Sequence, residues 1–342
     1  MFLEFSSNVI LAKARAMYGK RIKPKDFDNL LNCKSVFEIA SFLKNNTSYS
    51  KILSNVNESE VHRGELEYVI KNKIFDDLAS LGRYEIASGD DFSDYLIAKA
   101  EVEQIIHSLM YLFSLNQGKA PRKMPVFFIK HTKINLSALA NIKSYSDFLI
   151  ALRNSPYKKL LKDVKPLENG QFNLSQIEYI LYNYLYGILF KSIENTSKKS
   201  AKDKLMELYL TCVNYGNFVR IVRNKNNKST SSKFIILENG SISQKNINAM
   251  LQANSEHEIF DIMKSLHQGY LLKKIDYNYI DQIPLAALYK KCKHEIHSSV
   301  ESSVVLLSYM FLMENELNNI IKIIEGIRYN LSKDDILNFL IL

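Results

Sequence analysis

The sequence predicts an all-α protein built of three similar helical-bundle domains. Of the 342 residues only 11 are Gly and 6 are Pro, and the long stretches between them are rich in Leu, Ile, Lys, Glu and Ala, which favour helices. Hydrophobic residues make up 46% of the chain, enough for two or three packed domains rather than one. A motif that begins helices also recurs about every 110 residues.

This first repeated marker is a capping box. In such a box a Ser hydroxyl accepts a hydrogen bond from a free N–H of the first helical turn, and a carboxyl three residues later reaches back. Apolar residues stand on both sides of each box, and a Tyr follows. The three copies are Leu30, Leu31, Ser35, Glu38, Ile39, Leu43 and Tyr49; Leu139, Ala140, Ser144, Asp147, Phe148, Leu152 and Tyr157; and Met250, Leu251, Ser255, Glu258, Ile259, Met263 and Tyr270.

Two further markers keep the same order and predict longer helices. Residues 66–70 (LEYVI) parallel 177–181 (IEYIL) and, more weakly, 280–283 (IDQI). The third marker is a polar residue, an amide three positions later and two apolar residues. Polar side chains at this spacing share one helix face, where they can position a substrate or make a buried contact between helices. Chemistry seldom needs one pair three times, so we favour the structural interpretation for Glu101 and Gln104, Asn214 and Asn217, and Glu316 and Asn319.

Changes in composition place the boundaries between the repeats. Residues 116–125, with Gly118, Pro121 and Pro125, form one turn-prone joint, and the polar run 224–233 forms the second. We therefore expect three helical repeat domains, at residues 1–120, 121–232 and 233–342.

Charge and cysteine content narrow the class of protein. The net charge of +9 fits nucleic acid, an anionic membrane surface or an acidic protein as a partner, but the Lys and Arg residues are spread along the chain, as on solvated helix faces. Cys33, Cys212 and Cys292 lie too far apart to indicate a disulfide framework or a zinc site. The apolar runs 179–190 and 302–313 are shorter than the roughly 20 residues that span a bilayer, and no signal peptide is expected. These features predict a cytoplasmic protein.

Motifs for catalysis or cofactor binding are not expected. Gly118 and Lys119 lack the other residues of a phosphate-binding P-loop. His294 and His297 are three residues apart, where a zincin helix needs four and a third ligand. We predict no catalytic, cofactor-binding or metal-binding residues and no cofactor. Aromatic residues at helical spacing are typical of a core rather than of a nucleic-acid platform, as in Tyr179, Tyr182, Tyr186 and Phe190.

Short motifs in the first, middle and last thirds of the chain resemble those of one known family, the C-type subunits of V/A-type ATP synthases, whose counterparts in eukaryotic vacuolar pumps are the d-type subunits. Residues 25–33 (KDFDNLLNC), followed by Thr47 and Tyr49, resemble its N-terminal pattern, and Arg15 fits the small-and-basic helix that opens the family. The family's Glu-x-Glu-x-x-Asn-Ile-x-x-Ile-x-Glu-x-Ile signature is similar to Glu314, Glu316, Asn319, Ile320, Ile323, Glu325 and Ile327, with Asn318 in place of the usual Arg, and its middle motif to Asn217, Phe218, Arg220, Arg223 and Lys225.

The resemblance implies a non-catalytic rotor subunit rather than an enzyme. It implies three helical domains in a pseudo-threefold, funnel-like arrangement that links the central shaft to the membrane proteolipid ring and transmits torque for proton or sodium transport. Its partners would be shaft subunits of the D and F type and the ring, with one copy per complex, peripheral on the cytoplasmic face of the membrane. No small-molecule substrate and no nucleic acid are expected.

Two other classes of function remain open at this point. One is a helical repeat scaffold that binds other proteins or nucleic acid through its basic surface. The other is an enzyme whose site carries no recognisable motif, which would require a deep pocket with convergent polar groups.

Overall fold

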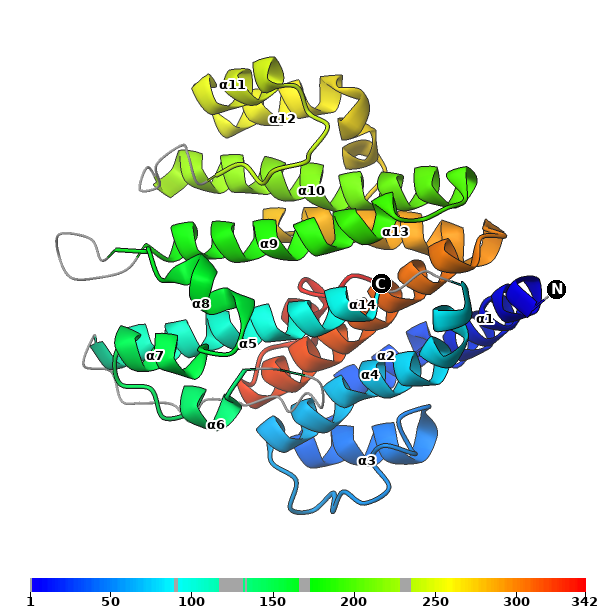
Figure 1. Ribbon diagram of the computed structural model, residues 1–342. Coiled ribbons are helices and arrows are strands. Elements are labelled where there is room, and N and C mark those ends of the chain that lie inside the picture. Colours follow the sequence, from blue (N-terminus) through cyan, green and yellow to red (C-terminus); the bar gives the residue numbers. More distant parts are fainter. Residues whose placement is uncertain (1, 89–91, 117–131, 133, 166–172, 228–234) are drawn as a thin grey trace. The chain divides into compact units, whose positions relative to one another are not determined.

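The regular secondary structure of the described part of the chain is helical, which confirms the predicted all-α class. The computed structural model describes residues 2–88, 92–116, 132, 134–165, 173–227 and 235–342, and over these residues it contains helices and no strand (Figure 1). The predicted joint at 116–125 lies outside the described residues except for Asn116, and so do Gly118 and Lys119. Of the joint at 224–233, residues 224–227 belong to a described helix and the rest lie outside the described residues.

The chain divides into two compact units. The first comprises Met1–Asp91, Ile193–Val222 and Gly240–Leu342, and the second comprises Phe92–Ser192 and Arg223–Asn239. The division into three domains at 1–120, 121–232 and 233–342 stays a prediction, as does their pseudo-threefold arrangement.

A long buried helix forms the centre of the first unit. This helix, α14, runs from Ser302 to Arg328, and every residue from Ser302 to Met313 is buried. A helix that is apolar on all sides must be covered on all sides, and α14 contacts α13, α1, α4, α2, α3 and α15. The helices of this unit are α1 (Phe2–Gly19), α2 (Pro24–Leu31), α3 (Val36–Asn46), α4 (Arg63–Ser88), most of α10 (Lys199–Asn227), α11 (Gln244–Gln252), α12 (Glu256–Ser265), η2 (His267–Lys273), η3 (Ile280–Gln282), α13 (Ile283–Ser298), α14 and α15 (Lys333–Leu337).

The second unit packs short helices with two long ones. Its elements are α5 (Ser93–Asn116), α6 (Leu136–Leu139), α7 (Tyr145–Ala151), α8 (Pro156–Leu161) and most of α9 (Leu174–Glu194). On α9 the fully buried side chains are spaced four apart, at Ile177, Leu181, Leu185, Leu189 and Ile193.

The aromatic residues of α9 were expected in the core, and this prediction was wrong. Tyr179, Tyr182, Tyr186 and Phe190 are only partly buried, and the rings of Tyr182 and Tyr186 stack on one another with centroids 6.2 Å apart. The aliphatic residues one or two positions away occupy the buried face instead.

The three predicted capping boxes begin helices α3, α7 and α12, as expected. The hydroxyl oxygens of Ser35, Ser144 and Ser255 each accept a hydrogen bond from the backbone N–H three residues later, at 3.1–3.2 Å. The carboxyl groups also reach back. Asp147 accepts from the N–H of Ser144 itself, whereas the longer Glu38 and Glu258 extend one residue further, to the N–H groups of Lys34 and Asn254.

A serine-to-alanine change at one of these caps should be measurable. Ser144→Ala removes the acceptor for the N–H of Asp147, so we expect the free energy of unfolding to fall by about 1 kcal/mol. Urea denaturation followed by circular dichroism measures the change. The control is Ser137→Ala at an exposed helical position, which should stay within about 0.5 kcal/mol of wild type; an equal loss in both variants would contradict the capping role.

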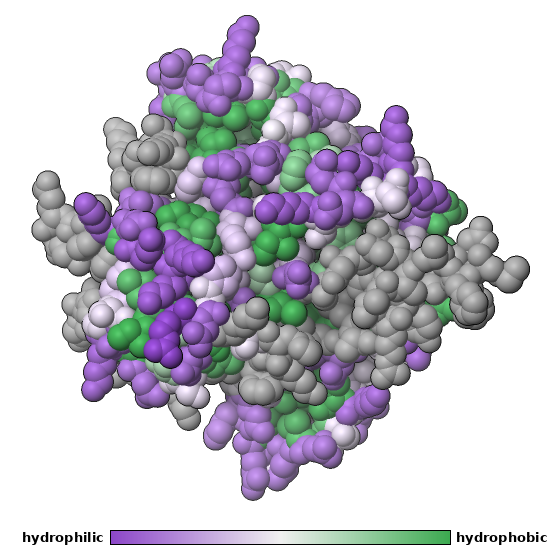
Figure 2. All heavy atoms as spheres, viewed as in Figure 1, coloured by the Kyte–Doolittle hydropathy of each residue, from purple (hydrophilic) through white to green (hydrophobic). Residues whose placement is uncertain are grey.

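The surface in view is mostly hydrophilic. On the face shown in Figure 2, hydrophilic residues cover most of the coloured surface, and hydrophobic residues appear in small separate areas. Over the described residues no helix combines the length and the apolar character that a membrane crossing requires.

Candidate functional site: buried polar junctions

The repeated polar pairs lie buried on three long helices, α5, α10 and α14. Exposed fractions range from 0% for Gln104 to 8% for Glu101. Since buried polar groups need partners, each pair must bond to a neighbouring segment. The structure confirms the structural interpretation of these pairs, because at least one member of each pair joins a long helix to the segment that leads into a pair of short helices.

The junction at Glu316 holds the N-terminal segment against α14. Its Oε2 accepts the backbone N–H of Ile22 at 2.7 Å, and its Oε1 accepts the hydroxyl of Tyr49 at 2.8 Å. Tyr49 is fully buried, and Thr47 begins the turn that leads to it by donating its hydroxyl to the carbonyl of Leu43. The Thr-x-Tyr motif therefore positions the Tyr49 hydroxyl to donate a hydrogen bond to the buried carboxyl of Glu316.

Burial dominates the acid–base behaviour of this junction. Desolvation raises the pKa of Glu316 to about 7, and the hydrogen bonds from Tyr49 and Ile22 and the charges of Lys73 and Arg21 act in the opposite direction. Burial also raises the pKa of Tyr49 well above its usual value, so that Tyr49 is a permanent donor.

The second junction, on α5, repeats this geometry. Glu101 accepts the hydroxyl of Thr132 on Oε1 at 2.5 Å and the hydroxyl of Tyr157 on Oε2 at 2.9 Å. Thr132 precedes α6, and Tyr157 is fully buried at the start of α8. Two carboxylates at equivalent positions thus receive equivalent tyrosines.

The third junction, on α10, replaces the carboxylate with an amide. Asn214 accepts the N–H of Ser241 on Oδ1 at 2.9 Å and donates from Nδ2 to the Ser241 hydroxyl at 2.8 Å. Gly240 lies directly against it, because a Cβ there would come within 3.1 Å of Asn214 Oδ1 and 3.3 Å of Asn217 Nδ2.

Tyr270 was predicted to be equivalent to Tyr49 and Tyr157, and this prediction was wrong, because Tyr270 is not a buried hydrogen-bond donor to a long helix. Its side chain is 37% exposed and its ring stacks on that of His267. The preceding Gly269 is buried instead, and a Cβ at this position would lie 1.7 Å from the carbonyl oxygen of Met263, so no side chain fits. The third junction therefore has no tyrosine donor. Its helix, α10, carries Asn214, whose amide group both accepts and donates a hydrogen bond.

The long helices α5 and α10 each make side-chain hydrogen bonds to the segment around the short helices that follow in sequence. The last long helix, α14, makes them to the segment around the first short helices. α5 bonds to residues 132 and 157, α10 bonds to residue 241, and α14 returns to residues 22 and 49. This cyclic order was not predicted. The available signal was that each polar pair precedes a copy of the first repeated marker in sequence, except for the last pair, which no copy of that marker follows.

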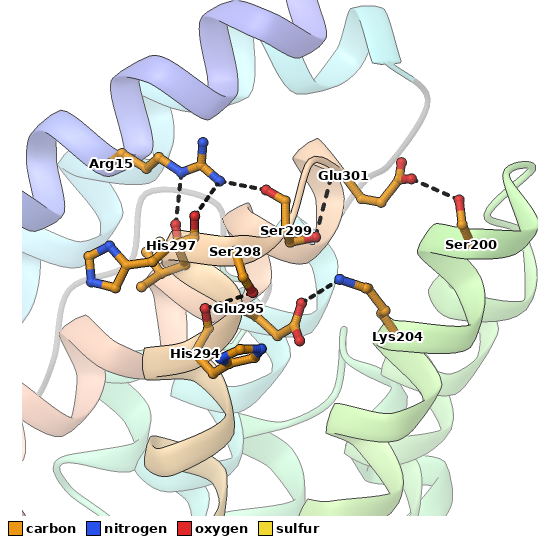
Figure 3. A network of polar contacts seen from close by, with 10 residues as sticks. Arg15, Ser200, Lys204, His294, Glu295, His297, Ser298, Ser299 and Glu301 are labelled. Atoms are coloured by element: carbon orange, nitrogen blue, oxygen red, sulfur yellow. Dashed lines mark hydrogen bonds and ion pairs between the residues drawn. The ribbon is translucent and has the colours of Figure 1, made fainter.

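A separate polar network joins α1, α10 and the turn between α13 and α14 (Figure 3). Arg15 donates to the carbonyl oxygens of Ile296 at 2.8 Å and Ser299 at 2.5 Å, where the end of α13 leaves carbonyls without helical partners. Glu301 accepts the Ser200 hydroxyl at 2.7 Å, and Lys204 pairs with Glu295 at 2.9 Å. The basic residue assigned by resemblance thus caps a helix.

The residues that resemble catalytic or metal motifs serve other purposes. The ring of His297 packs edge-on against Tyr18, with centroids 5.7 Å apart, and the carbonyl of His294 accepts the Ser298 hydroxyl. Within the described ranges no three His, Cys, Asp or Glu side chains are grouped to hold a metal ion. Cys292 is a buried free thiol whose pKa is raised by burial.

Fold and junctions together define an all-helical protein with internally repeated polar junctions between long and short helices. The sequence model of the ATP synthase (C/AC39) subunit family matches residues 10–339, and the chain therefore belongs to that family. Members of this family are non-catalytic subunits of the ATP synthase complex. The C-type subunit of the A-type ATP synthase of Methanosphaera stadtmanae is 24% identical over 234 residues, which cover 67% of this chain. The match spans 57% of that protein's length, less than two thirds.

Proposed function

We propose that this chain is a non-catalytic coupling subunit of a V/A-type rotary ATPase. It links the central shaft to the membrane proteolipid ring and transmits torque for proton or sodium transport. Its partners are shaft subunits of the D and F type and the ring, with one copy per complex at the cytoplasmic face of the membrane. Membership of the ATP synthase (C/AC39) subunit family is the observation that carries this proposal.

The physical demand of this role is stiffness, and the buried junctions support it. A satisfied polar network in a low-dielectric interior fixes the relative position of the elements it joins. In each of the three copies a long helix is bonded to a segment that leads into a pair of short helices, through Ile22, Thr132 and Ser241. We propose on the same ground that the three repeat domains form a pseudo-threefold, funnel-like body. Durable attachment to shaft and ring also requires interfaces of more than about 1,000 Å² in total.

Omitting the chain from a reconstituted complex tests the proposal. ATP hydrolysis by the catalytic head should continue, since no catalytic group is removed, while ATP-driven ion uptake into vesicles should fall to background because torque no longer reaches the ring. Phosphate release and a fluorescent ion indicator measure the two activities.

Adding back the purified chain is the matched control and should restore ion uptake. Uptake that persists without the chain would contradict the proposed function. If the chain instead copurifies with nucleic acid and a pull-down contains no rotor subunits, the basic surface serves a scaffold role, which is the alternative that the net charge of +9 leaves open.

A further inference from the structure

A small pocket opens beside the Glu316 junction in the first unit. It has a volume of about 100 Å³ and lies between the α1–α2 turn, α13, α14 and residues 341–342. Apolar side chains line much of it, including Phe27, Leu312 and Ile341. This volume accommodates a single aliphatic side chain and is far too small for a lipid acyl chain.

Two cationic side chains, Arg21 and Lys293, line the pocket and make no ion pair with a carboxylate of the described residues. Arg21 lies over the ring of Tyr18 with its guanidinium carbon 4.3 Å from the ring centroid, and Lys293 lies over Tyr289 at 5.3 Å. Neither makes an ion pair with any residue that the structure describes. Exposed lysines at positions 20, 23 and 25 flank Arg21. Aromatic faces hold the two cations in place, so the pocket presents ordered positive charge to solvent.

An unsatisfied acceptor lines the same pocket. Asn315 is only 3% exposed and donates from Nδ2 to the carbonyl of Ile341 at 2.8 Å, but its Oδ1 has no hydrogen-bond partner. Buried acceptors are rarely left in this state. The neighbouring Glu316 already uses both of its oxygens on Ile22 and Tyr49. Although the Arg21 charge acts on the pKa of Glu316, the two side chains make no direct ion pair, and Arg21 and Lys293 can still pair with an incoming carboxylate.

We propose that this pocket binds an acidic segment of a partner protein. One aliphatic side chain of the segment fills the pocket, and flanking carboxylates pair with Arg21 and Lys293. An acidic peptide supplies both the aliphatic side chain and the carboxylates within a few residues, whereas a lipid headgroup supplies no side chain of the right size. The inference goes beyond the proposed coupling role and is tested on the chain alone, so the two can fail separately.

The test uses the full chain and a fluorescein-labelled peptide, acetyl-Glu-Glu-Leu-Glu-Glu-amide, whose binding is followed by fluorescence anisotropy. We expect saturable binding that weakens at least fivefold when the central Leu becomes Ala or when all Glu become Gln. The double variant Arg21→Gln and Lys293→Gln should weaken binding at least tenfold. The single variant Lys293→Gln, at an exposed position, should weaken it at least threefold and keeps the test valid if the double variant misfolds.

The matched control removes the same charge elsewhere in the first unit. Lys199→Gln combined with Lys245→Gln, both exposed, should leave the affinity within twofold of wild type. An equal loss in this control would show general charge attraction and overturn the proposal, as would absence of saturable binding. Binding to phosphatidylglycerol vesicles that depends on Arg21 and Lys293, without peptide binding, would assign the surface to lipid and overturn it too.

Discussion

Gly269→Ala should destabilise the protein severely, by about 3 kcal/mol or more. The added methyl group would lie 1.7 Å from the backbone oxygen of Met263 and 2.6 Å from its carbonyl carbon. Because the obstacle is backbone rather than a flexible side chain, the turn between α12 and η2 must move to relieve the clash. Thermal and urea unfolding of the full chain measure the loss.

The control for this variant is a glycine with free space around it. Gly216 lies within α10, and a Cβ there meets no atom within 4 Å. Gly216→Ala should therefore raise the free energy of unfolding by about 0.5–1 kcal/mol, since alanine favours a helix over glycine. If both variants had the same effect, the steric explanation for Gly269 would be wrong.

The second large effect is expected at Glu316. Glu316→Ala leaves the Tyr49 hydroxyl and the Ile22 N–H buried without an acceptor, which should cost about 3 kcal/mol of folding free energy. At about pH 5, where Glu316 is protonated in the folded protein, Glu316→Gln should change the stability little, because the amide oxygen can accept from Ile22 while the Tyr49 hydroxyl accepts from the amide nitrogen. Chemical denaturation of the two variants distinguishes the outcomes, and equal losses would contradict the junction's geometry.

The same carboxyl should make stability depend on pH. The pKa of Glu316 is about 7 in the folded protein and 4.5 for an ordinary Glu, so the folded state holds this proton more tightly. Its stabilising contribution is complete below pH 4.5 and is lost as the pH rises through 7. Relative to Glu316→Gln, wild type should be about equally stable at about pH 5 and about 1–3 kcal/mol less stable at about pH 8. A constant difference across this range would contradict the shift.

Local interactions were predictable from sequence, and distant ones were not. Ser35, Ser144 and Ser255 begin helices through bonds to residues three positions away, so the motif alone contains the geometry. The partner of Tyr49 is 267 residues distant, and no local pattern connects it to Glu316. The burial of the polar pairs could be inferred because it recurs three times, but their partners required the fold.

The third tyrosine illustrates why an approximate repeat misleads. The order of residues along the chain made Tyr270 equivalent to Tyr49 and Tyr157, yet the backbone at Gly269 admits no side chain, and the side chain of Tyr270 is 37% exposed. The exchange of carboxylate for amide at Asn214 was visible in the sequence. This exchange accompanies a change of partner, because Asn214 bonds to Ser241 and not to a tyrosine.

The return of α14 to the first short helices has a consequence for biosynthesis. Tyr49 and Ile22 leave the ribosome long before Glu316, which is 267 residues downstream of Tyr49. At about 5–20 residues per second, the interval is roughly 13–53 s. During this time the Tyr49 hydroxyl and the Ile22 N–H lack the acceptor that Glu316 provides, so this junction forms only after most of the chain has been translated.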